Sequence, residues 1–137
     1  MAQVLLIESD PLLAGNLERA LKKAGHKVER QPEPAAAISS ADKKSPDIII
    51  MDLLFAGRTG VEFLYEFRSY PEWIDVPVII YSSVPEIETG LYLDEFVRLG
   101  VKHYFYKAST SLATLTEAVN YLANHESRKT PPTSYAL

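Results

Sequence analysis

The chain has 137 residues, of which 47% are hydrophobic and 23% are charged, and its formal net charge is −4. This length suits one domain with a closed hydrophobic core, and the mild negative charge argues against a direct nucleic-acid role. The absence of cysteine excludes disulfides, thiolate metal sites and cysteine nucleophiles, and it favours a reducing compartment. Neither a signal peptide nor an apolar run of membrane-spanning length is visible, so we expect a cytoplasmic protein with no membrane insertion.

A buried-strand pattern and then a helix start open the chain. Residues 4–7 are all apolar, as is typical of a parallel strand that is buried on both faces. Asp10 followed by Pro11 predicts a helix start, because aspartate is a good N-cap and proline fits the first helical position. Apolar residues then recur at helical spacing until Gly25, which predicts the end of this helix.

The rest of the chain continues this alternation of strands and helices. Further strands are predicted at residues 27–30, 48–51, 76–81 and 103–106. Further helices are predicted near residues 35–41, 61–67, 86–99 and 112–122, with a loop over residues 54–60. This alternation predicts an α/β fold in which helices cover both faces of a parallel sheet. We expect one domain over residues 1–125 and a polar tail over residues 126–137.

Polar side chains follow four of the predicted strands. They are Glu8, Asp52, Ser82 and Lys107. Functional residues of such sheets gather beyond the carboxyl ends of the strands, so we expect these four side chains to converge. Two neighbouring carboxylates need a cation or a shared proton, and Mg²⁺ is the usual cation. An ammonium group and a hydroxyl beside them favour the binding of phosphate-like oxygens.

The segments around these residues carry a recognisable pattern over roughly residues 3–125. They are Ile7–Pro11, Pro46–Asp52, Pro77–Ser83 and Gly100–Lys107. Together they resemble the receiver domain of two-component response regulators. The resemblance implies a flavodoxin-like (βα)5 fold, with a doubly wound parallel sheet of five strands in the order 2-1-3-4-5. It also implies a signalling domain that is not an enzyme, with no chemistry beyond its own phosphorylation and dephosphorylation.

The resemblance also implies a role for each residue of the pocket. Asp52 would be the phosphoacceptor and would take a phosphoryl group from the phosphohistidine of a sensor histidine kinase or of a phosphotransfer protein. Mg²⁺ would be held by Glu8, by Asp52 and by the backbone carbonyl of Leu54. No other cofactor is implied.

A second group of residues would carry the signal. By the same resemblance, Ser82 would bind a phosphoryl oxygen and move toward it, while Lys107 would neutralise charge on the acyl phosphate. Tyr104 would then turn inward as an aromatic switch. The output surface would be the fourth helix, fifth strand and fifth helix, which would contact a downstream protein target and is compatible with a homodimer. Because nothing like an output domain follows residue 125, we expect the receiver to act alone.

The sequence departs from the family pattern at several positions. Ser9 stands where the family has a second acidic residue, and Ala108 stands where it has a proline after the lysine. Ala56 replaces another proline, and Thr59 replaces the aspartate of an Asp-Gly pair. Asp10 could replace the missing acid, although its place before a proline favours a helix cap. One carboxylate fewer predicts weaker Mg²⁺ binding and slower phosphoryl transfer.

Two other functions stay open at this point. A pseudo-receiver would keep the fold and act as a phosphorylation-independent protein-interaction module, and Ser9 and Ala108 favour it. A flavodoxin-type enzyme or cofactor-binding protein ranks last, because it would need a glycine-rich or hydroxyl-rich loop after the first strand. The sequence has acidic residues there, which would repel phosphate.

Three aromatic residues have two interpretations each, and the histidines have no assigned role. Tyr104 is either a moving switch or an ordinary core residue. Tyr92 and Phe96 on the fourth helix are either interface anchors or core residues. The three histidines fall away from the predicted pocket, and we assign none of them a catalytic or metal-binding role.

Overall fold

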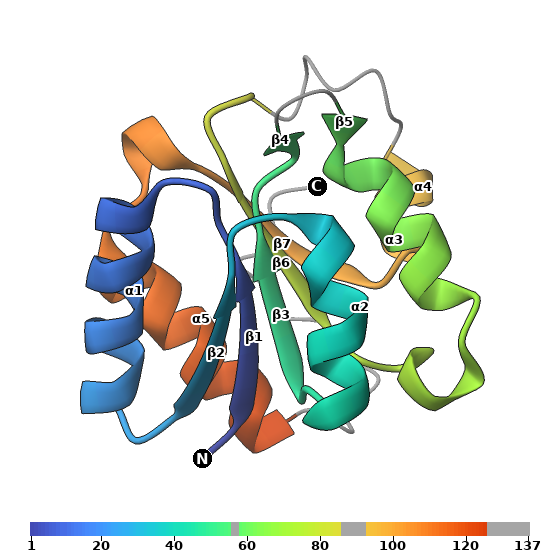
Figure 1. Cartoon of the computed structure of the whole chain (residues 1–137). Coiled ribbons are helices and arrows are strands. Elements are labelled where there is room, and N and C mark those ends of the chain that lie inside the picture. The colour runs from blue at the N-terminus through green and yellow to red at the C-terminus, as the bar shows by residue number, and fades with distance from the viewer. Residues whose placement is uncertain (56–57, 86–92, 126–137) are drawn as a thin grey trace.

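Five parallel strands form the main sheet of the computed structural model, which describes residues 1–55, 58–85 and 93–125 (Figure 1). The strands are β1 (Gln3–Ile7), β2 (Lys27–Gln31), β3 (Ile48–Met51), β6 (Val78–Ser82) and β7 (Val101–Tyr106). They lie in the order β2-β1-β3-β6-β7, and every pair of neighbours is parallel. Counted along the chain within this sheet, that is the predicted order 2-1-3-4-5, so the doubly wound α/β fold is confirmed.

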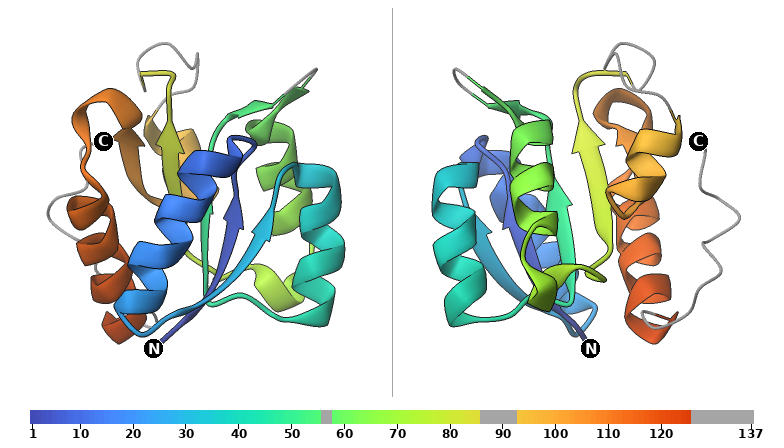
Figure 2. Two further views of the ribbon diagram at one scale, coloured as in Figure 1. Left: turned by 60° about the vertical axis from the view of Figure 1, so that its left-hand side comes forward. Right: turned by 90° about the vertical axis from the view of Figure 1, so that its right-hand side faces the viewer.

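Helices cover both faces of this sheet, as Figure 2 shows. One face is covered by α1 (Pro11–Lys23) and α5 (Leu112–His125), and the other by α2 (Pro34–Lys43), α3 (Gly60–Arg68) and α4 (Leu93–Arg98). Two single 3-10 turns, Pro71–Trp73 and Lys107–Ser109, complete the helical segments of the described residues. Within that part of the chain, no helix has the length and apolar character needed to cross a bilayer.

Strand β3 lies between two separate hydrophobic clusters. Ile49 and Met51 belong to the cluster under α2, α3 and α4, whereas Ile48 and Ile50 belong to the cluster under α1 and α5. Successive side chains of a strand point to opposite faces, so a strand that is covered on both sides must be apolar throughout. All four residues of β3 are buried, as their sequence predicts.

The first helix begins and ends where the sequence predicts. The side chain of Asp10 accepts hydrogen bonds from the N–H groups of Leu12 at 3.0 Å and Leu13 at 3.2 Å. These bonds satisfy donors that have no partner inside the helix, which is the role of an N-cap. At the other end, Gly25 follows α1 with a φ of +98°, a conformation that glycine adopts at little cost.

His26 joins the sheet to α5. Its Nδ1 accepts the Ala2 N–H at 3.0 Å, which assigns the ring proton to Nε2, and Nε2 donates to Asn120 Oδ1 at 2.7 Å. This arrangement gives His26 a structural role. His103 is also buried and stacks on Phe105 with ring centroids 5.1 Å apart, and burial lowers the pKa of His103 to about 4.

The structure differs from the sequence-based expectation mainly between residues 54 and 60. The predicted loop contains a short antiparallel pair, β4 (Leu54–Phe55) with β5 (Arg58–Thr59). Each strand has two residues, which is too short for an alternating pattern to be recognised in sequence. Other boundaries move by a few residues, as when the predicted strand over residues 76–81 becomes β6.

Of the fourth predicted helix, the structure describes α4 (Leu93–Arg98). Phe96 is fully buried and belongs to the cluster on that face, so it is a core residue and not an interface anchor. Tyr92 and the start of the helix predicted over residues 86–99 lie outside the described residues. The tail predicted over residues 126–137 also lies outside them.

Candidate functional site

The structure brings together the four side chains that follow the strands. Glu8 comes directly after β1, Asp52 directly after β3, Ser82 ends β6, and Lys107 comes directly after β7. These strands are neighbours in the sheet, and their carboxyl ends lie at the same edge. The predicted convergence follows from this register, because parallel strands that end at one edge place their next residues side by side.

Asp52 is the centre of the site and is only 4% exposed. Its Oδ1 accepts the backbone N–H of Leu53 at 2.6 Å, the backbone N–H of Leu54 at 3.1 Å and the hydroxyl of Ser82 at 2.7 Å. Its Oδ2 accepts the ammonium of Lys107 at 2.7 Å. These contacts fix the orientation of the carboxylate, and hydrogen bonds to a charged acceptor are stronger than those between neutral groups.

Lys107 bridges the two carboxylates of the pocket. Its Nζ lies 2.7 Å from Asp52 Oδ2 and 3.0 Å from Glu8 Oε1. Burial by itself would lower the pKa of Lys107, but the hydrogen bonds to Asp52 and Glu8, with the charges of these two residues, outweigh burial and raise it. The ammonium is therefore charged at neutral pH, and the three side chains together carry one negative charge.

Glu8 is held on its second oxygen by the neighbouring backbone. Its Oε2 accepts the N–H of Asp10 at 3.1 Å, and the residue is 5% exposed. The carboxylate of Asp10 caps α1, as described above, so it does not take the place of the acid that Ser9 lacks. Two carboxylates remain, and the described residues contain no group of three histidine, cysteine or acidic side chains suited to a metal ion.

The oxygen atoms at this edge of the sheet fit a Mg²⁺ site that has few negatively charged ligands. Mg²⁺ binds oxygen ligands, keeps several waters and is usually held by one or two carboxylates. The carboxylates of Glu8 and Asp52 meet that requirement, and the backbone of Leu54 reaches the same place because its N–H contacts Asp52. Lys107, which bridges both carboxylates, carries a positive charge that would repel a metal ion bound beside it.

A chain of hydrogen bonds leads from Asp52 to the aromatic residue on β7. Ser82 Oγ donates to Asp52 and accepts the backbone N–H of Val84 at 3.1 Å. The carbonyl of Val84 accepts the hydroxyl of Tyr104 at 2.6 Å. Tyr104 is 6% exposed, and its ring meets Phe96 edge-on with centroids 5.5 Å apart. Sequence reasoning missed Val84, because its role depends on backbone atoms alone.

Gly60 packs directly against the pocket. A Cβ atom on this residue would lie 2.8 Å from the backbone oxygen of Asp52 and 2.6 Å from Met51 Cε. The N–H of Gly60 also donates to the carbonyl of Leu53 at 2.7 Å. The sequence pattern included this glycine, but only the structure shows that it lets the start of α3 approach the strand end so closely.

The sequence of this chain matches a known protein family. The family model "Response regulator receiver domain" matches residues 4–120. The chain belongs to this family. Receiver domains of two-component response regulators are signalling domains that interact with histidine kinases and downstream targets, and they generally bind Mg²⁺.

Relatives of this receiver domain include proteins of different lengths. PilH of Pseudomonas aeruginosa is 26% identical over 83 residues, which are 61% of this chain and 69% of PilH. The probable transcriptional regulatory protein TcrX of Mycobacterium tuberculosis is 26% identical over 85 residues, or 62% of this chain and 36% of TcrX. KdpE of Escherichia coli is 31% identical over 63% of this chain and 37% of KdpE. The match therefore spans little more than a third of the two transcriptional regulators.

Solved structures share the fold of this receiver domain. The chemotaxis protein CheY4 of Vibrio cholerae has a TM-score of 0.77 and 23% identity, covering 88% of this chain and 98% of CheY4. The response regulator TrrA of Thermotoga maritima, solved in complex with Mg²⁺ and BeF, has a TM-score of 0.73 and 20% identity, covering 89% and 99% of the two chains. These likenesses establish the flavodoxin-like fold.

Proposed function

We propose that Asp52 accepts a phosphoryl group from a histidine kinase or a phosphotransfer protein, and that the phosphorylated domain signals to a protein target. The observation that carries this proposal is the buried carboxylate of Asp52, held by Ser82 and Lys107 beside Glu8 at one edge of the sheet. The signal would leave through α4, β7 and α5, a face through which two copies could also pair. The cysteine-free composition supports action in the cytoplasm.

The proposed reaction is an in-line phosphoryl transfer. An oxygen of Asp52 forms a bond to phosphorus while the bond between phosphorus and the donor histidine nitrogen breaks, and the electron pair of that bond stays on the imidazole. The N–H groups of Leu53 and Leu54 orient the attacking carboxylate before the donor arrives. Lys107 lies within reach of the negative charge that builds up on the phosphoryl oxygens.

Mg²⁺, when bound, would neutralise further phosphoryl charge and help to align the group that is transferred. We assign its protein ligands to Glu8, Asp52 and the backbone carbonyl of Leu54. Ser9 contributes no carboxylate, so we expect this site to bind Mg²⁺ less tightly than a pocket with a third acid.

We assign the conformational response to Ser82 and Tyr104. Phosphorylation would give the Ser82 hydroxyl a new acceptor in place of Asp52 Oδ1. Any movement of Ser82 changes its bond to the N–H of Val84, and the carbonyl of the same residue holds the Tyr104 hydroxyl. The charge change at Asp52 would thereby bias the position of an aromatic side chain on β7.

A pseudo-receiver is the second candidate, and one observation favours it. Lys107 already pairs with both carboxylates, and Ser82 already donates to Asp52, so each carboxylate has a partner without metal or phosphate. A site in which one lysine already offsets part of the negative charge has less need of Mg²⁺. Such a domain would present its α4, β7 and α5 face to a partner independently of phosphorylation.

Incubation with Mg²⁺ and acetyl phosphate, followed by intact-mass measurement, tests the two candidates. A phosphoryl mass gain that Asp52→Asn abolishes would support the receiver, and Ser9→Asp should then increase the rate because it adds a metal ligand. If the wild type gains nothing while Ser9→Asp is phosphorylated, position 9 has silenced the pocket and the pseudo-receiver is favoured. If neither protein is modified, Asp52 is not an acceptor for this donor and the receiver proposal fails.

A further inference from the structure

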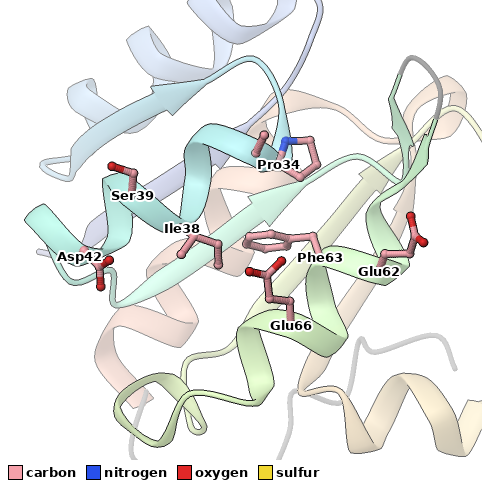
Figure 3. Close-up of a pocket in the computed structure, with 8 residues that line it drawn as sticks. Pro34, Ile38, Ser39, Asp42, Glu62, Phe63 and Glu66 are labelled. Carbon is pink, nitrogen blue, oxygen red and sulfur yellow. The ribbon is translucent and has the colours of Figure 1, made fainter.

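A hollow lies between α2 and α3, and none of the four side chains of the strand-end pocket lines it (Figure 3). Its volume is about 500 Å³. The residues that matter for its chemistry are Pro34, Ile38, Asp42, Glu62, Phe63 and Glu66. Neither the phosphoacceptor chemistry nor the α4, β7 and α5 face uses them.

The floor of this hollow is apolar. The side chains of Ile38 on α2 and Phe63 on α3 point toward each other in Figure 3. Phe63 belongs to the buried cluster on this face of the sheet, and Ile38 is partly buried against that cluster. Pro34 lines one end. An apolar side chain inserted here would meet a surface that is already anchored in the core, so little rearrangement would be needed.

The rim of the hollow carries only negative charge. Asp42, Glu62 and Glu66 are exposed, and none of them makes an ion pair with a described residue. Glu62 and Glu66 stand one helical turn apart, a spacing at which like charges weaken a helix. A cationic group that binds between the helices would reduce the repulsion among these carboxylates.

The lysines of the α2 region lie on another side of the helix. Lys44 pairs with Glu29 at 3.2 Å, and Lys43 and Lys44 line a separate hollow beside β2. The two sides of α2 therefore have different charge, and the side toward α3 is the acidic one. This separation keeps the negative potential of the α2–α3 hollow from being cancelled locally.

We infer that the α2–α3 hollow docks a partner protein through a cationic helix, which carries one large apolar side chain flanked by Lys or Arg. The apolar side chain would rest on Ile38 and Phe63, and the basic residues would pair with Asp42, Glu62 and Glu66. A helix fits because recognition in a groove uses anchors about one turn apart. Nucleic acid and anionic lipid are disfavoured, since their phosphates would face three carboxylates.

The probe is a synthetic alanine-based helix with one central leucine flanked on both sides by lysines one turn away. Two control peptides carry glutamate in place of the lysines or serine in place of the leucine. Binding is followed on the full chain by backbone amide NMR shifts and by fluorescence anisotropy of labelled peptide. We expect shifts confined to α2 and α3, and binding at least about tenfold weaker for both control peptides.

Variants of the receiver separate docking from diffuse attraction. The double variant Glu62→Gln with Glu66→Gln should weaken binding about tenfold, and Ala35→Lys should weaken it too, because it puts a cation in the hollow. Glu117→Gln is the charge-matched control: it lies exposed on α5, on the other face of the sheet, and should change binding less than about twofold.

Three results would overturn the inference. The first is the absence of shifts at α2 and α3 with the cationic peptide, and the second is equal weakening by Glu117→Gln. The third is a different occupant: a dimer in sedimentation velocity that Ala35→Lys dissociates would indicate a second copy of this chain. If Arg128→Glu with Lys129→Glu changes the amide NMR shifts of α2 and α3 in the absence of peptide, the occupant would be the chain's own C-terminal segment.

Discussion

Replacing Lys107 with methionine removes the charge that holds the pocket together but keeps much of the side-chain length. Its ammonium makes charge-assisted hydrogen bonds of 2.7 Å to Asp52 and 3.0 Å to Glu8, whose side chains are 5% and 3% exposed. Each such bond contributes about 1.5–3 kcal/mol. Because the Lys107 side chain is 20% exposed, solvent screens part of this energy.

We expect Lys107→Met to lower the free energy of unfolding by about 3 kcal/mol in Mg²⁺-free buffer at neutral pH. Two buried carboxylates would be left near each other without a cation, which is the costly way to break a buried ion pair. The loss corresponds to a change of about a hundredfold in the ratio of folded to unfolded protein. Urea unfolding followed by fluorescence can measure it, because the single tryptophan, Trp73, is buried against Phe67.

The pH dependence provides a second check on the same variant. The pKa of Lys107 is raised in the folded state, so its stabilisation is complete below the unfolded value and is lost only as pH rises through the folded value. For lysine this loss lies above about pH 10.4. The difference between wild type and variant should therefore be constant around neutral pH.

Lys44→Met is the matched control, since Lys44 makes one ion pair of 3.2 Å with Glu29 at side-chain exposures of 60% and 38%. An exposed pair of this kind contributes less than about 1 kcal/mol. If Lys107→Met cost no more than this control, the Glu8–Lys107–Asp52 bridge would not be a significant source of stability, and our account of the pocket's electrostatics would be wrong.

Three further substitutions test other contacts by urea unfolding. Gly60→Ala should cost about 1–3 kcal/mol, because its Cβ would press on the backbone of Asp52, and an unchanged midpoint would refute that packing. Asp10→Ala should cost about 1 kcal/mol through loss of the α1 cap, whereas Asp10→Asn should retain most of that stability. His103 has a pKa lowered by burial to about 4, so stability should fall as pH drops from about 6.5 toward 4, by up to about 3 kcal/mol. His103→Phe should flatten this slope, and an equal slope in both proteins would exclude His103 as its source.

The order of the elements could be predicted because each has a strong local pattern. The apolar run of residues 48–51 predicts a strand with helices on both of its faces. The Asp10-Pro11 pair predicts a helix start and Gly25 a helix end, because each favours the local backbone conformation found there. The β4–β5 pair could not be predicted, since a pairing of two residues on each side depends on how the flanking elements position the chain. For the same reason only packing showed that Phe96 is a core residue.

By itself the sequence determined which side chains stand at the strand ends, because strand register follows from hydrophobic pattern and topology. It placed Glu8, Asp52, Ser82 and Lys107 at one edge and showed that Ser9 adds no second acid. Only the tertiary structure decided how these groups satisfy one another: that Lys107 joins two carboxylates, and that Val84 links Ser82 to Tyr104. It also created the acidic hollow between α2 and α3. Such features depend on distances between residues remote in sequence, which folding sets and no local pattern encodes.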